Sequence, residues 1–293
     1  MVTIIGHRRG ITNDALAEAW RELGIEAQVL DPEAALREVA PGELALNRLD
    51  VLETLDGIEP GLDAVAELVA RGARVLNRPD ALRAAHDKLE TARRLEAAGI
   101  PHPRTSHVAG ADAVVELAPP MVVKPRYGSW GRDVFRCSTE RELTDCLRSV
   151  RGRSWFRRHG ALVQELVPPQ GYDLRLVVAG GDVVAAAERV APPGEWRTNV
   201  SLGGTLRPAR TSPEAWSLGL AAAEALDIDV VGVDLVPTPD GWLVLELNGA
   251  ADFDERYRVG GASVYRAVAA ALGLTSSRAA GAASGLDGLT YTG

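Results

Sequence analysis

The sequence predicts an α/β fold in which a small N-terminal unit is followed by two further lobes. Short apolar strands alternate with amphipathic helices along residues 1–80, a pattern typical of a sheet covered by helices. Beyond them a strand that ends in a lysine leads into a glycine-rich loop, and successive apolar strands fill the last third of the chain. Since 46% of the 293 residues are hydrophobic, the chain can build the cores that these units require.

The first unit is predicted to span residues 1–80. Apolar residues recur at helical spacing from Ala15 to Leu23, and Gly24 ends that helix. The strands of this unit are expected at residues 2–5, 27–30, 44–46 and 75–76, and its helices at 13–23 and 62–70.

The second unit is predicted over residues 81–166. Residues 79–99 have helical spacing that two helices could share, and the glycine and proline of Gly99-Ile100-Pro101 end it. Two strands flank the glycine-rich loop, which predicts a hairpin. The elements after residue 100 are expected as an extended stretch at 104–108, helices near 111–117 and at 139–150, and strands at 121–124, 134–136 and 162–166.

The third unit is predicted over residues 167–274. Its strands are expected at 173–179, 183–189, 231–236 and 242–247, and its helices at 215–226 and 263–272. From Thr275 onward serine, alanine and glycine dominate and cannot bury enough apolar area to become ordered. Residues 275–293 are therefore predicted to form a flexible tail.

Composition argues against several classes of function. A net charge of −8 and a pI of about 5.3 describe a surface that repels a phosphate backbone, so no nucleic-acid partner is expected. No apolar run approaches the ~20 residues of a membrane span and no signal segment is evident, so we expect a cytoplasmic protein with no membrane partner. Cys137 and Cys146 are expected to be reduced thiols, because no further cysteine or histidine cluster accompanies them.

The glycine-rich loop is the first candidate for chemistry. Lys124 ends a strand, and Gly128, Ser129 and Gly131 follow it. Glycines let backbone amides approach a ligand closely, and the Ser129 hydroxyl and the Lys124 ammonium can bind phosphate oxygens. The loop lacks the Gly-Lys-Ser/Thr ending of a Walker loop. Taken alone, it is equally consistent with a plain hairpin turn.

A second candidate is formed by Asp234, Glu246 and Asn248. Both carboxylates lie inside apolar strands, where an unpaired charge carries a heavy desolvation cost. Glu246 and Asn248 face the same side of their strand, and Asp234 could face them from a paired neighbour. Two carboxylates and an amide oxygen are ligands that Mg²⁺ prefers. The alternative is that Asp234 and Glu246 pair with arginines.

Together the two candidates indicate a nucleotide site, and here the sequence resembles the ATP-grasp superfamily. The similar branch contains the ribosomal-protein S6 glutamate ligase and the lysine- and arginine-biosynthesis ligases that act on an amino-group carrier protein (RimK-like and LysX-like proteins). The resemblance covers roughly residues 1–273. It implies a pre-ATP-grasp domain followed by a two-lobed α+β ATP-grasp fold, and it implies binding of ATP with two Mg²⁺ ions, for which Mn²⁺ could substitute.

Further motifs match this branch in order along the chain. The resemblance implies that Lys88 and Lys124 contact phosphates, that residues 164–167 form the hinge that holds adenine, and that Asp173 contacts the ribose. The nucleotide-binding set is then Lys88, Lys124, Gly128, Ser129, Gly131, Gln164, Glu165, Leu166, Val167 and Asp173. The same resemblance implies a catalytic set near the acyl phosphate made of Arg175, Arg189 and Asn199.

Each of these residues also has a plainer interpretation. Lys88 could be a solvated helix lysine, and Asp173 and Arg175 could pair with each other. Arg189 and Arg197 could be surface charges, and Asn199 a turn residue. The ordered series of matches favours the functional interpretation.

The segment after Asn248 departs from the family pattern. The S6-type ligases continue to a Pro-Gly, whereas this chain continues with Gly249-Ala250-Ala251-Asp252-Phe253-Asp254. This segment borders the acceptor site in the family, so the resemblance does not identify the amine. A basic patch of Arg8, Arg9, Arg256 and Arg258 could attract an acidic carrier protein.

The resemblance implies an ATP-dependent carboxylate–amine ligase that forms an amide or peptide bond through an acyl phosphate. One substrate is expected to be an amino acid such as glutamate, and the acceptor a free amino acid, a peptide or a carrier protein. A homodimer or homotetramer is expected. The alternatives are a small-molecule kinase on the same scaffold and a nucleotide-binding protein without turnover.

Overall fold

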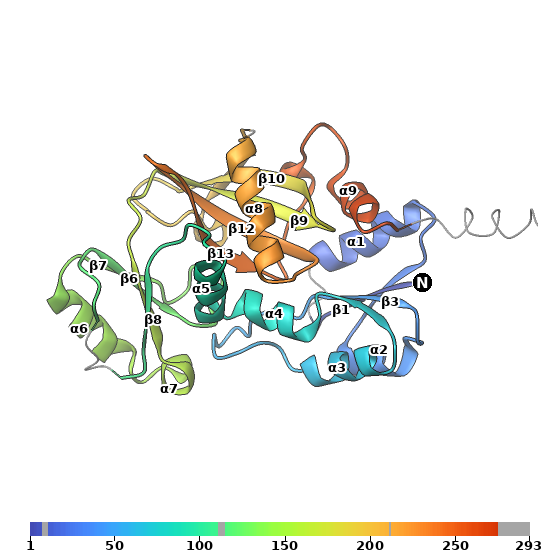
Figure 1. Cartoon of the computed structure of the whole chain (residues 1–293), viewed down its shortest axis with the longest axis horizontal. Coiled ribbons are helices and arrows are strands. Elements are labelled where there is room, and N and C mark those ends of the chain that lie inside the picture. Colours follow the sequence, from blue (N-terminus) through green and yellow to red (C-terminus); the bar gives the residue numbers. More distant parts are fainter. Residues whose placement is uncertain (8–10, 111–114, 211, 275–293) are drawn as a thin grey trace, which may run out of the picture.

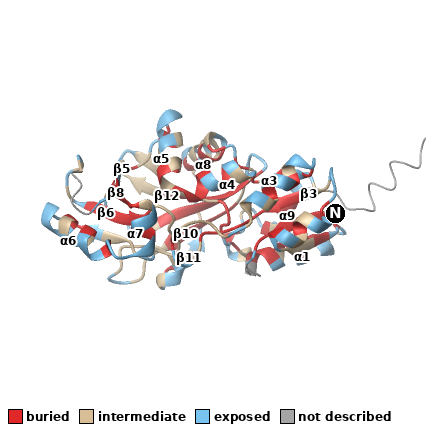
Figure 2. Cartoon of the chain, turned by 90° about the horizontal axis from the view of Figure 1, so that it is seen from below, coloured by how far each residue is buried: buried red, intermediate tan, exposed pale blue. Residues whose placement is uncertain are grey.

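The computed structural model describes residues 1–7, 11–110, 115–210 and 212–274. It contains three sheets that lie along the length of the molecule (Figure 1). Buried residues concentrate on the strands of these sheets and on the inner faces of the helices that cover them (Figure 2). Among the described residues no helix is long and apolar enough to cross a bilayer.

The first sheet is parallel and lies near the N-terminus. Ile4 faces the apolar side chains of one helix, whereas Ile5 packs against two others, so helices cover both faces. The strand order is β2-β1-β3-β4, with strands β1 (Val2–Ile5), β2 (Ala27–Leu30), β3 (Leu44–Asn47) and β4 (Arg74–Leu76) and helices α1 (Ile11–Glu22), α2 (Pro32–Glu38) and α3 (Leu62–Ala70).

The second sheet is antiparallel and lies at the opposite end of the molecule in Figure 1. Leu143 and Leu147 pack with Met121 of the sheet in one apolar cluster. The strand order is β5-β8-β6-β7, with strands β5 (Thr105–Val108), β6 (Met121–Pro125), β7 (Phe135–Cys137) and β8 (Ala161–Glu165) and helices α6 (Glu140–Val150) and α7 (Ser154–His159).

The third sheet is antiparallel and lies between the other two (Figure 1). Leu176 packs with residues of one helix, while Val177 faces the opposite side and packs in the cluster that contains α1. The strand order is β11-β10-β9-β12-β13, with strands β9 (Tyr172–Ala179), β10 (Asp182–Val190), β11 (Thr205–Pro208), β12 (Val230–Thr238) and β13 (Gly241–Asn248) and helices α8 (Pro213–Ala225) and α9 (Val264–Ala271).

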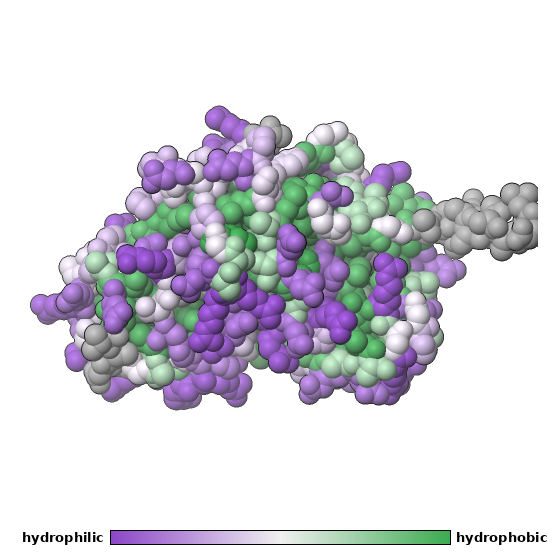
Figure 3. Space-filling model, viewed as in Figure 1, coloured by the Kyte–Doolittle hydropathy of each residue, from purple (hydrophilic) through white to green (hydrophobic). Residues whose placement is uncertain are grey.

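Two consecutive helices, α4 (Pro79–His86) and α5 (Lys88–Ala97), connect the first sheet to the second. Asp87 separates them, and its side chain accepts the amides of Leu89 and Glu90 at the start of α5. Hydrophilic side chains gather over these helices on the face shown in Figure 3. Their inner faces are apolar, so the helices place Asp87 and Lys88 beside the other lobes.

Asn77 joins the first sheet to the third. Its buried side chain donates to the carbonyls of Val230 and Gly249 at 2.8 and 3.2 Å, and its Oδ1 accepts the Val230 amide at 2.8 Å. Trp20 adds a second link, because its Nε1 donates to the carbonyl of Tyr265 at 3.0 Å. The Asn77 bond to Gly249 fixes the end of β13, which carries part of the candidate site, and the Trp20 bond joins α1 to α9.

The predicted strands and most of the predicted helices are present with bounds shifted by a few residues. Residues 79–99 are indeed shared by two helices. Three elements, α2, α7 and β11, were not predicted. The sequence at α2 does carry a start signal, since Asp31 caps the helix and Pro32 occupies its first turn.

Three other predictions fall wholly or partly outside the residues that the structure describes. Residues 115–117 are not helical, and residues 111–114 of the expected helix lie outside the described residues. Arg8 and Arg9 also lie outside them, as does the expected tail at 275–293. The divisions at residues 80, 166 and 274 stay predictions.

Candidate active site

Two pockets open beside the third sheet. The inter-sheet pocket lies between the second and third sheets, is open to solvent, and is lined by β6, β8, β12 and the glycine-rich loop. The Arg48 pocket is also open to solvent and is lined by Thr12, Asn13, Arg48 and Asp50 of the first unit together with residues of the third. The two pockets share Ser129, Arg189, Asn199 and Glu246.

All sixteen residues of the predicted nucleotide-binding, catalytic and metal sets line one of these pockets. Arg175 and Asn248 line the Arg48 pocket, and the other fourteen line the inter-sheet pocket. Residues more than a hundred positions apart are therefore brought to one place. The plainer interpretations of Lys88 and Arg189 as solvated charges are wrong, because the side chains are 10% and 5% exposed.

The hinge at residues 164–167 borders one end of the inter-sheet pocket. The amide of Glu165 donates to the carbonyl of Arg104, and the amide of Leu166 donates to the carbonyl of Pro120. The next two residues after Val167 are prolines, which have no N–H. Val167 is therefore the hinge residue whose amide can donate to a ligand at this end of the pocket.

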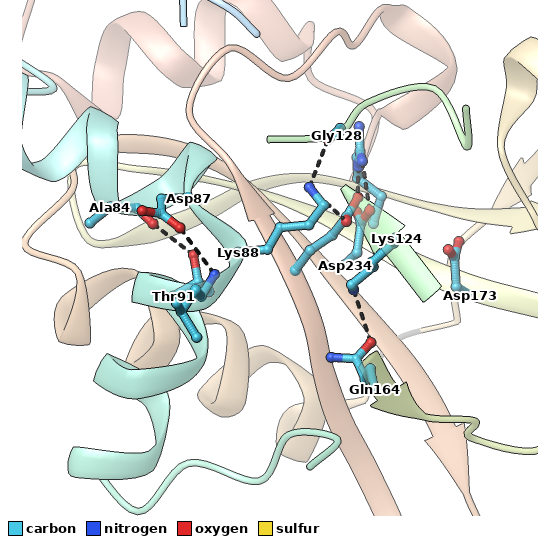
Figure 4. Close-up of polar contacts among 12 residues, drawn as sticks. Ala84, Asp87, Lys88, Thr91, Lys124, Gly128, Gln164, Asp173 and Asp234 are labelled. Carbon is cyan, nitrogen blue, oxygen red and sulfur yellow. Dashed lines mark hydrogen bonds and ion pairs between the residues drawn. The ribbon is translucent and has the colours of Figure 1, made fainter. Parts of the chain in front are cut away.

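Two lysines enter the pocket from different elements, Lys88 from the start of α5 and Lys124 from β6 (Figure 4). Lys88 Nζ donates to the carbonyl of Gly128 at 2.7 Å and lies 3.1 Å from Oε2 of Glu246. Lys124 is buried, and its Nζ donates to Oε1 of Gln164 at 2.9 Å. Lys88 thus has a carboxylate partner, whereas Lys124 donates to a neutral oxygen, and two ammonium groups directed into one cavity are suited to binding an anion.

Burial lowers the pKa of Lys124 from its ordinary value of 10.5 to about 8. Glu246 opposes this shift and the charge of Lys88 adds to it. An anion bound beside Lys124 would offset the desolvation free energy of the buried ammonium group and raise the pKa of Lys124 again.

Asp87 ties the start of α5 to the glycine-rich loop. Its carboxylate accepts Nε of Arg126 at 2.6 Å and the hydroxyl of Tyr127 at 3.2 Å, and the amide of Lys88 donates to the carbonyl of Arg126 at 3.1 Å. The Arg126 guanidinium, with other hydrogen bonds, outweighs burial and lowers the pKa of Asp87. Lys88 is thereby held in a fixed position relative to the loop.

The loop is also held against the third unit. Arg197 Nη1 donates to the carbonyl of Gly131 at 2.9 Å, and the Ser201 hydroxyl donates to the carbonyl of Trp130 at 2.9 Å. Gly131 has a φ of +67°, and a Cβ there would lie 2.7 Å from Oδ1 of Asn199. Glycine is therefore required at Gly131 for this close approach.

Four charged residues form a buried ladder across three strands of the third sheet. Asp173 on β9 is opposite Arg189 on β10, and Arg175 on β9 is opposite Asp234 on β12. Arg189 Nε donates to Asp173 at 2.8 Å, and its Nη2 donates to Asp234 at 2.7 Å. Arg175 Nη2 also donates to Asp234, at 2.7 Å. The alternative in which Asp173 pairs with Arg175 is wrong, whereas Asp234 does pair with arginines.

The ladder sets the charge of its central carboxylate. Burial alone would raise the pKa of Asp234, but Arg175 and Arg189 outweigh it and hold the pKa well below the ordinary value. Asp234 is therefore ionised across the physiological range. Glu246 is directly opposite Asp234 on β13 and carries its own counter-charge, Lys88.

Comparison with known proteins decides the family. The RimK-like ATP-grasp domain matches residues 85–272. The chain belongs to the RimK-like ATP-grasp family. A probable alpha-L-glutamate ligase of Alkalilimnicola ehrlichii is 30% identical over 250 residues, which cover 80% of this chain and 82% of that protein.

Solved structures show the same fold. A RimK-domain ATP-grasp protein from Sphaerobacter thermophilus has a TM-score of 0.67 at 23% identity and covers 92% of this chain and 98% of its own. The ATP-grasp ligase PsnB, in complex with a minimal precursor, Mg and ADP, has a TM-score of 0.67 at 19% identity over 93% of this chain and 97% of its own. The family match and the 30% identity to a probable ligase show that this chain is an ATP-grasp ligase, as the sequence predicted.

The donors available to a metal in this RimK-like chain are hard oxygen atoms. Within the described ranges, no three histidine, cysteine, aspartate or glutamate side chains converge on one point, so carboxylates alone do not make a metal cage. Glu246 and Asn248 face the same side of β13 and both line the Arg48 pocket. These two oxygen donors suit a Mg²⁺ ion that also keeps phosphate oxygens and water. The Asp234 carboxylate already accepts three hydrogen bonds from Arg175 and Arg189, and these bonds would compete with a metal ion for its oxygen atoms.

Several residues of the site were missed in the sequence analysis. Arg48, Thr12 and Asn13 come from the first unit, and Tyr257 follows the segment after Asn248. No local motif marks them. The clearest signal in the sequence is the polar pair formed by Asn47, the last residue of β3, and Arg48, which follows it, because residues at the end of a parallel strand often face a site.

If Lys124 binds phosphate as predicted, its lowered pKa should make nucleotide affinity depend on pH. Because its folded pKa of about 8 lies below the ordinary 10.5, the ammonium loses its proton as pH rises through 8, and only the charged form attracts phosphate. We expect the Kd of a non-hydrolysable ATP analogue to rise by up to about tenfold between pH 7 and 9. Isothermal titration of wild type and Lys124→Met measures this. The variant should bind weakly at both pH values, and a variant with the same pH slope as wild type would contradict the assignment.

Proposed function

We propose that this ATP-grasp ligase joins a carboxylate to the amine of an amino acid through an acyl phosphate. The amino acid that we propose is L-glutamate. The observation that carries the proposal is the pair of pockets that meet at Ser129, Arg189, Asn199 and Glu246. A nucleotide in one pocket and an amino acid in the other would meet at these residues. Glutamate is proposed because the curated relatives are probable alpha-L-glutamate ligases.

ATP would occupy the inter-sheet pocket. The amide of Val167 would donate to adenine, Asp173 would face the ribose, and Lys88 and Lys124 would bind phosphate oxygens. The amides of Gly128, Ser129 and Gly131 would cover the transferring group and exclude water from it. The contacts from Arg197 and Ser201 to this loop support its closure over the pocket.

Glu246 and Asn248 would hold Mg²⁺, with Asp234 as a third ligand that is shared with Arg175 and Arg189. We propose two ions, as the family resemblance implies. Bound Mg²⁺ would supply charge neutralisation at the phosphates. Glu246 would also keep Lys88 in place, since the two side chains already form an ion pair at 3.1 Å.

The reaction has two steps. A carboxylate oxygen of one substrate attacks the γ-phosphorus of ATP, so that an acyl phosphate forms and ADP leaves. The uncharged amine of the second substrate then attacks the acyl carbon, and inorganic phosphate leaves with one oxygen of the original carboxylate. Arg189 and Asn199 line both pockets, so they can stabilise the negative charge on the carbonyl oxygen during this attack.

The carboxylate partner would be a metabolite, a peptide or a carrier protein. We also propose that the chain works in the cytoplasm and that it forms a homodimer or homotetramer, the latter as the family resemblance implies. Size-exclusion chromatography with light scattering measures the oligomeric state directly.

Trapping with hydroxylamine tests the proposed reaction. The chain is incubated with ATP, Mg²⁺, hydroxylamine and a panel of amino acids and short peptides as carboxylates. We expect one carboxylate to yield a hydroxamate in equal amount to the ADP released. A stable phosphoester would instead indicate a kinase. Absence of ADP release across the panel would show a nucleotide-binding protein without turnover and would refute the ligase.

A further inference from the structure

Arg48 is a buried cation whose hydrogen bonds to the described residues go to neutral oxygen atoms. It follows β3, is 4% exposed, and lines the pocket named after it. Its Nε donates to Oδ1 of Asn13 at 2.6 Å, and its Nη2 donates to the carbonyl of Ala251 at 2.9 Å. The guanidinium therefore has a fixed orientation at the pocket wall.

The charge balance distinguishes Arg48 from the other arginines of the site. Among the described residues three arginines are buried, and two of them, Arg175 and Arg189, form ion pairs with Asp234 and Asp173. Arg48, the third, forms no ion pair within 4.0 Å with any of the described residues. A buried guanidinium without a paired carboxylate is costly unless a ligand supplies the anion.

The nearest carboxylates of the protein do not serve as that anion. Asp50 and Asp252 act on Arg48 over a longer distance, and burial still lowers the Arg48 pKa despite them. Asp252 is exposed, and its Oδ1 already accepts the Thr12 hydroxyl at 2.9 Å. Asp50 Oδ1 accepts the amide of Val51 at 2.7 Å. The space in front of Arg48 thus remains suited to a negatively charged group of a ligand.

The position of Arg48 indicates which group this is. It does not line the inter-sheet pocket, where the reacting carboxylate must meet the γ-phosphate. It is close to the reacting end nevertheless, because Arg48 and Arg175 line the same pocket and its hydrogen-bond partner Ala251 lies near Arg175. A Cβ added at Gly232 would lie 2.5 Å from the Ala251 Cβ and 3.7 Å from Cδ of Arg175. A carboxylate bound by Arg48 would therefore lie close to the reacting amine. In an α-amino acid the carboxylate and the amine are attached to the same carbon atom, which gives this short spacing.

We propose that Arg48 binds the α-carboxylate of the amino acid that supplies the amine. The proposal rests on the ligase reaction proposed above and adds a residue that selects its second substrate. The acidic residues Asp252 and Asp254 also line this pocket and can attract the ammonium form of the same amino acid before it loses a proton. An amine without an adjacent carboxylate would leave the Arg48 charge unpaired and would bind weakly.

The proposal also gives a physical role to the segment that departs from the family pattern. The carbonyl of Ala251 orients Arg48, and the Thr12 hydroxyl accepts the amide of Phe253 at 3.2 Å. The Phe253 ring lies 5.8 Å from the Arg48 guanidinium carbon. Residues 251–253 therefore lock the first unit to the third and fix the guanidinium between them.

The test compares L-glutamate with its α-amide, L-isoglutamine, as amine substrates in wild type and Arg48→Gln. The carboxylate partner is the one that hydroxylamine trapping identifies, and ADP release is measured. In wild type the KM for the α-amide should exceed that for L-glutamate by about 10- to 100-fold, because a charge-assisted pair is lost. In Arg48→Gln the KM for L-glutamate should rise by a similar factor and the two substrates should become equivalent.

Controls separate this role from a structural one. Arg71→Gln, an exposed arginine of the first unit paired with Glu67, should keep both KM values. Arg48→Lys keeps a charge and should restore part of the preference for L-glutamate even if the glutamine variant folds poorly. Melting temperature and binding of a non-hydrolysable ATP analogue check folding in each variant.

Two results would overturn the inference. One is a wild type that uses L-glutamate and its α-amide equally well, which would leave the ligase reaction standing. The other is an equal loss for both substrates in Arg48→Gln and Arg48→Lys, which would show that Arg48 only supports the fold. If wild type traps no hydroxamate at all, the ligase proposal fails first and the role of Arg48 falls with it.

Discussion

Replacement of Glu246 by glutamine is expected to lower the rate of ADP formation by about 10²- to 10³-fold. The variant keeps the size of the side chain and removes its charge. That charge pairs with Lys88 at 3.1 Å and would also hold Mg²⁺, so both the lysine and the ion lose an anchor at the transferring phosphate. A coupled assay for ADP at saturating ATP, repeated over a range of Mg²⁺ concentrations, measures the effect.

A matched control for this variant is Glu224→Gln. Glu224 is an exposed residue of α8 and lines neither pocket. Its replacement should leave the rate of ADP formation unchanged within about twofold, as is usual for a surface substitution. If Glu246→Gln kept the full rate at every Mg²⁺ concentration, the assignment of Glu246 to the phosphate site would be wrong.

The second large effect concerns stability. Asp234→Asn is expected to lower the free energy of unfolding by about 3–5 kcal/mol, because it leaves Arg175 and Arg189 buried with only Asp173 to balance them. Denaturant unfolding followed by circular dichroism measures the difference. The pKa of Asp234 is held well below its ordinary value, so the loss should be the same at pH 6 and pH 8.

An exposed ion pair gives the contrast for this prediction. Asp145 lies 3.9 Å from Arg141 on α6, and both side chains are mostly exposed. Asp145→Asn should change the free energy of unfolding by less than about 1 kcal/mol, since solvent screens such a pair. Equal losses for Asp145→Asn and Asp234→Asn would contradict the view that the ladder is a buried network.

The parts of the fold that follow from local pattern could be predicted from the sequence. The strands that flank the glycine-rich loop are antiparallel, with Met121 opposite Cys137. Two apolar segments on either side of a glycine-rich turn predict such a hairpin. The register that puts Asp234 opposite Glu246 also matches the expectation from period two. In both cases the decisive residues are close in sequence.

Ion-pair partners could not be predicted in the same way. Asp173 and Arg175 lie two residues apart on one strand, which suggested that they pair with each other. The structure pairs Asp173 with Arg189 and Arg175 with Asp234, because neighbouring strands bring opposite charges closer than positions along one strand do. Only the register of the sheet reveals this.

The Arg48 pocket could not be predicted from the sequence at all, because its residues are far apart along the chain. The bond between Arg48 and the carbonyl of Ala251 joins residues 203 positions apart. No spacing rule connects a polar residue after β3 with a segment after β13. The sequence did identify residues 249–254 as a departure from the family pattern, and the structure supplies the contacts of that segment.

The measurement that tests the central claim most directly follows an oxygen atom. The carboxylate substrate is labelled with ¹⁸O in its carboxyl group, and the inorganic phosphate released with ATP, Mg²⁺ and L-glutamate is analysed by mass spectrometry. An acyl phosphate requires that each phosphate molecule carry one oxygen from the carboxylate, so the phosphate should acquire one ¹⁸O atom per amide formed. Unlabelled phosphate released together with amide would contradict the proposed mechanism.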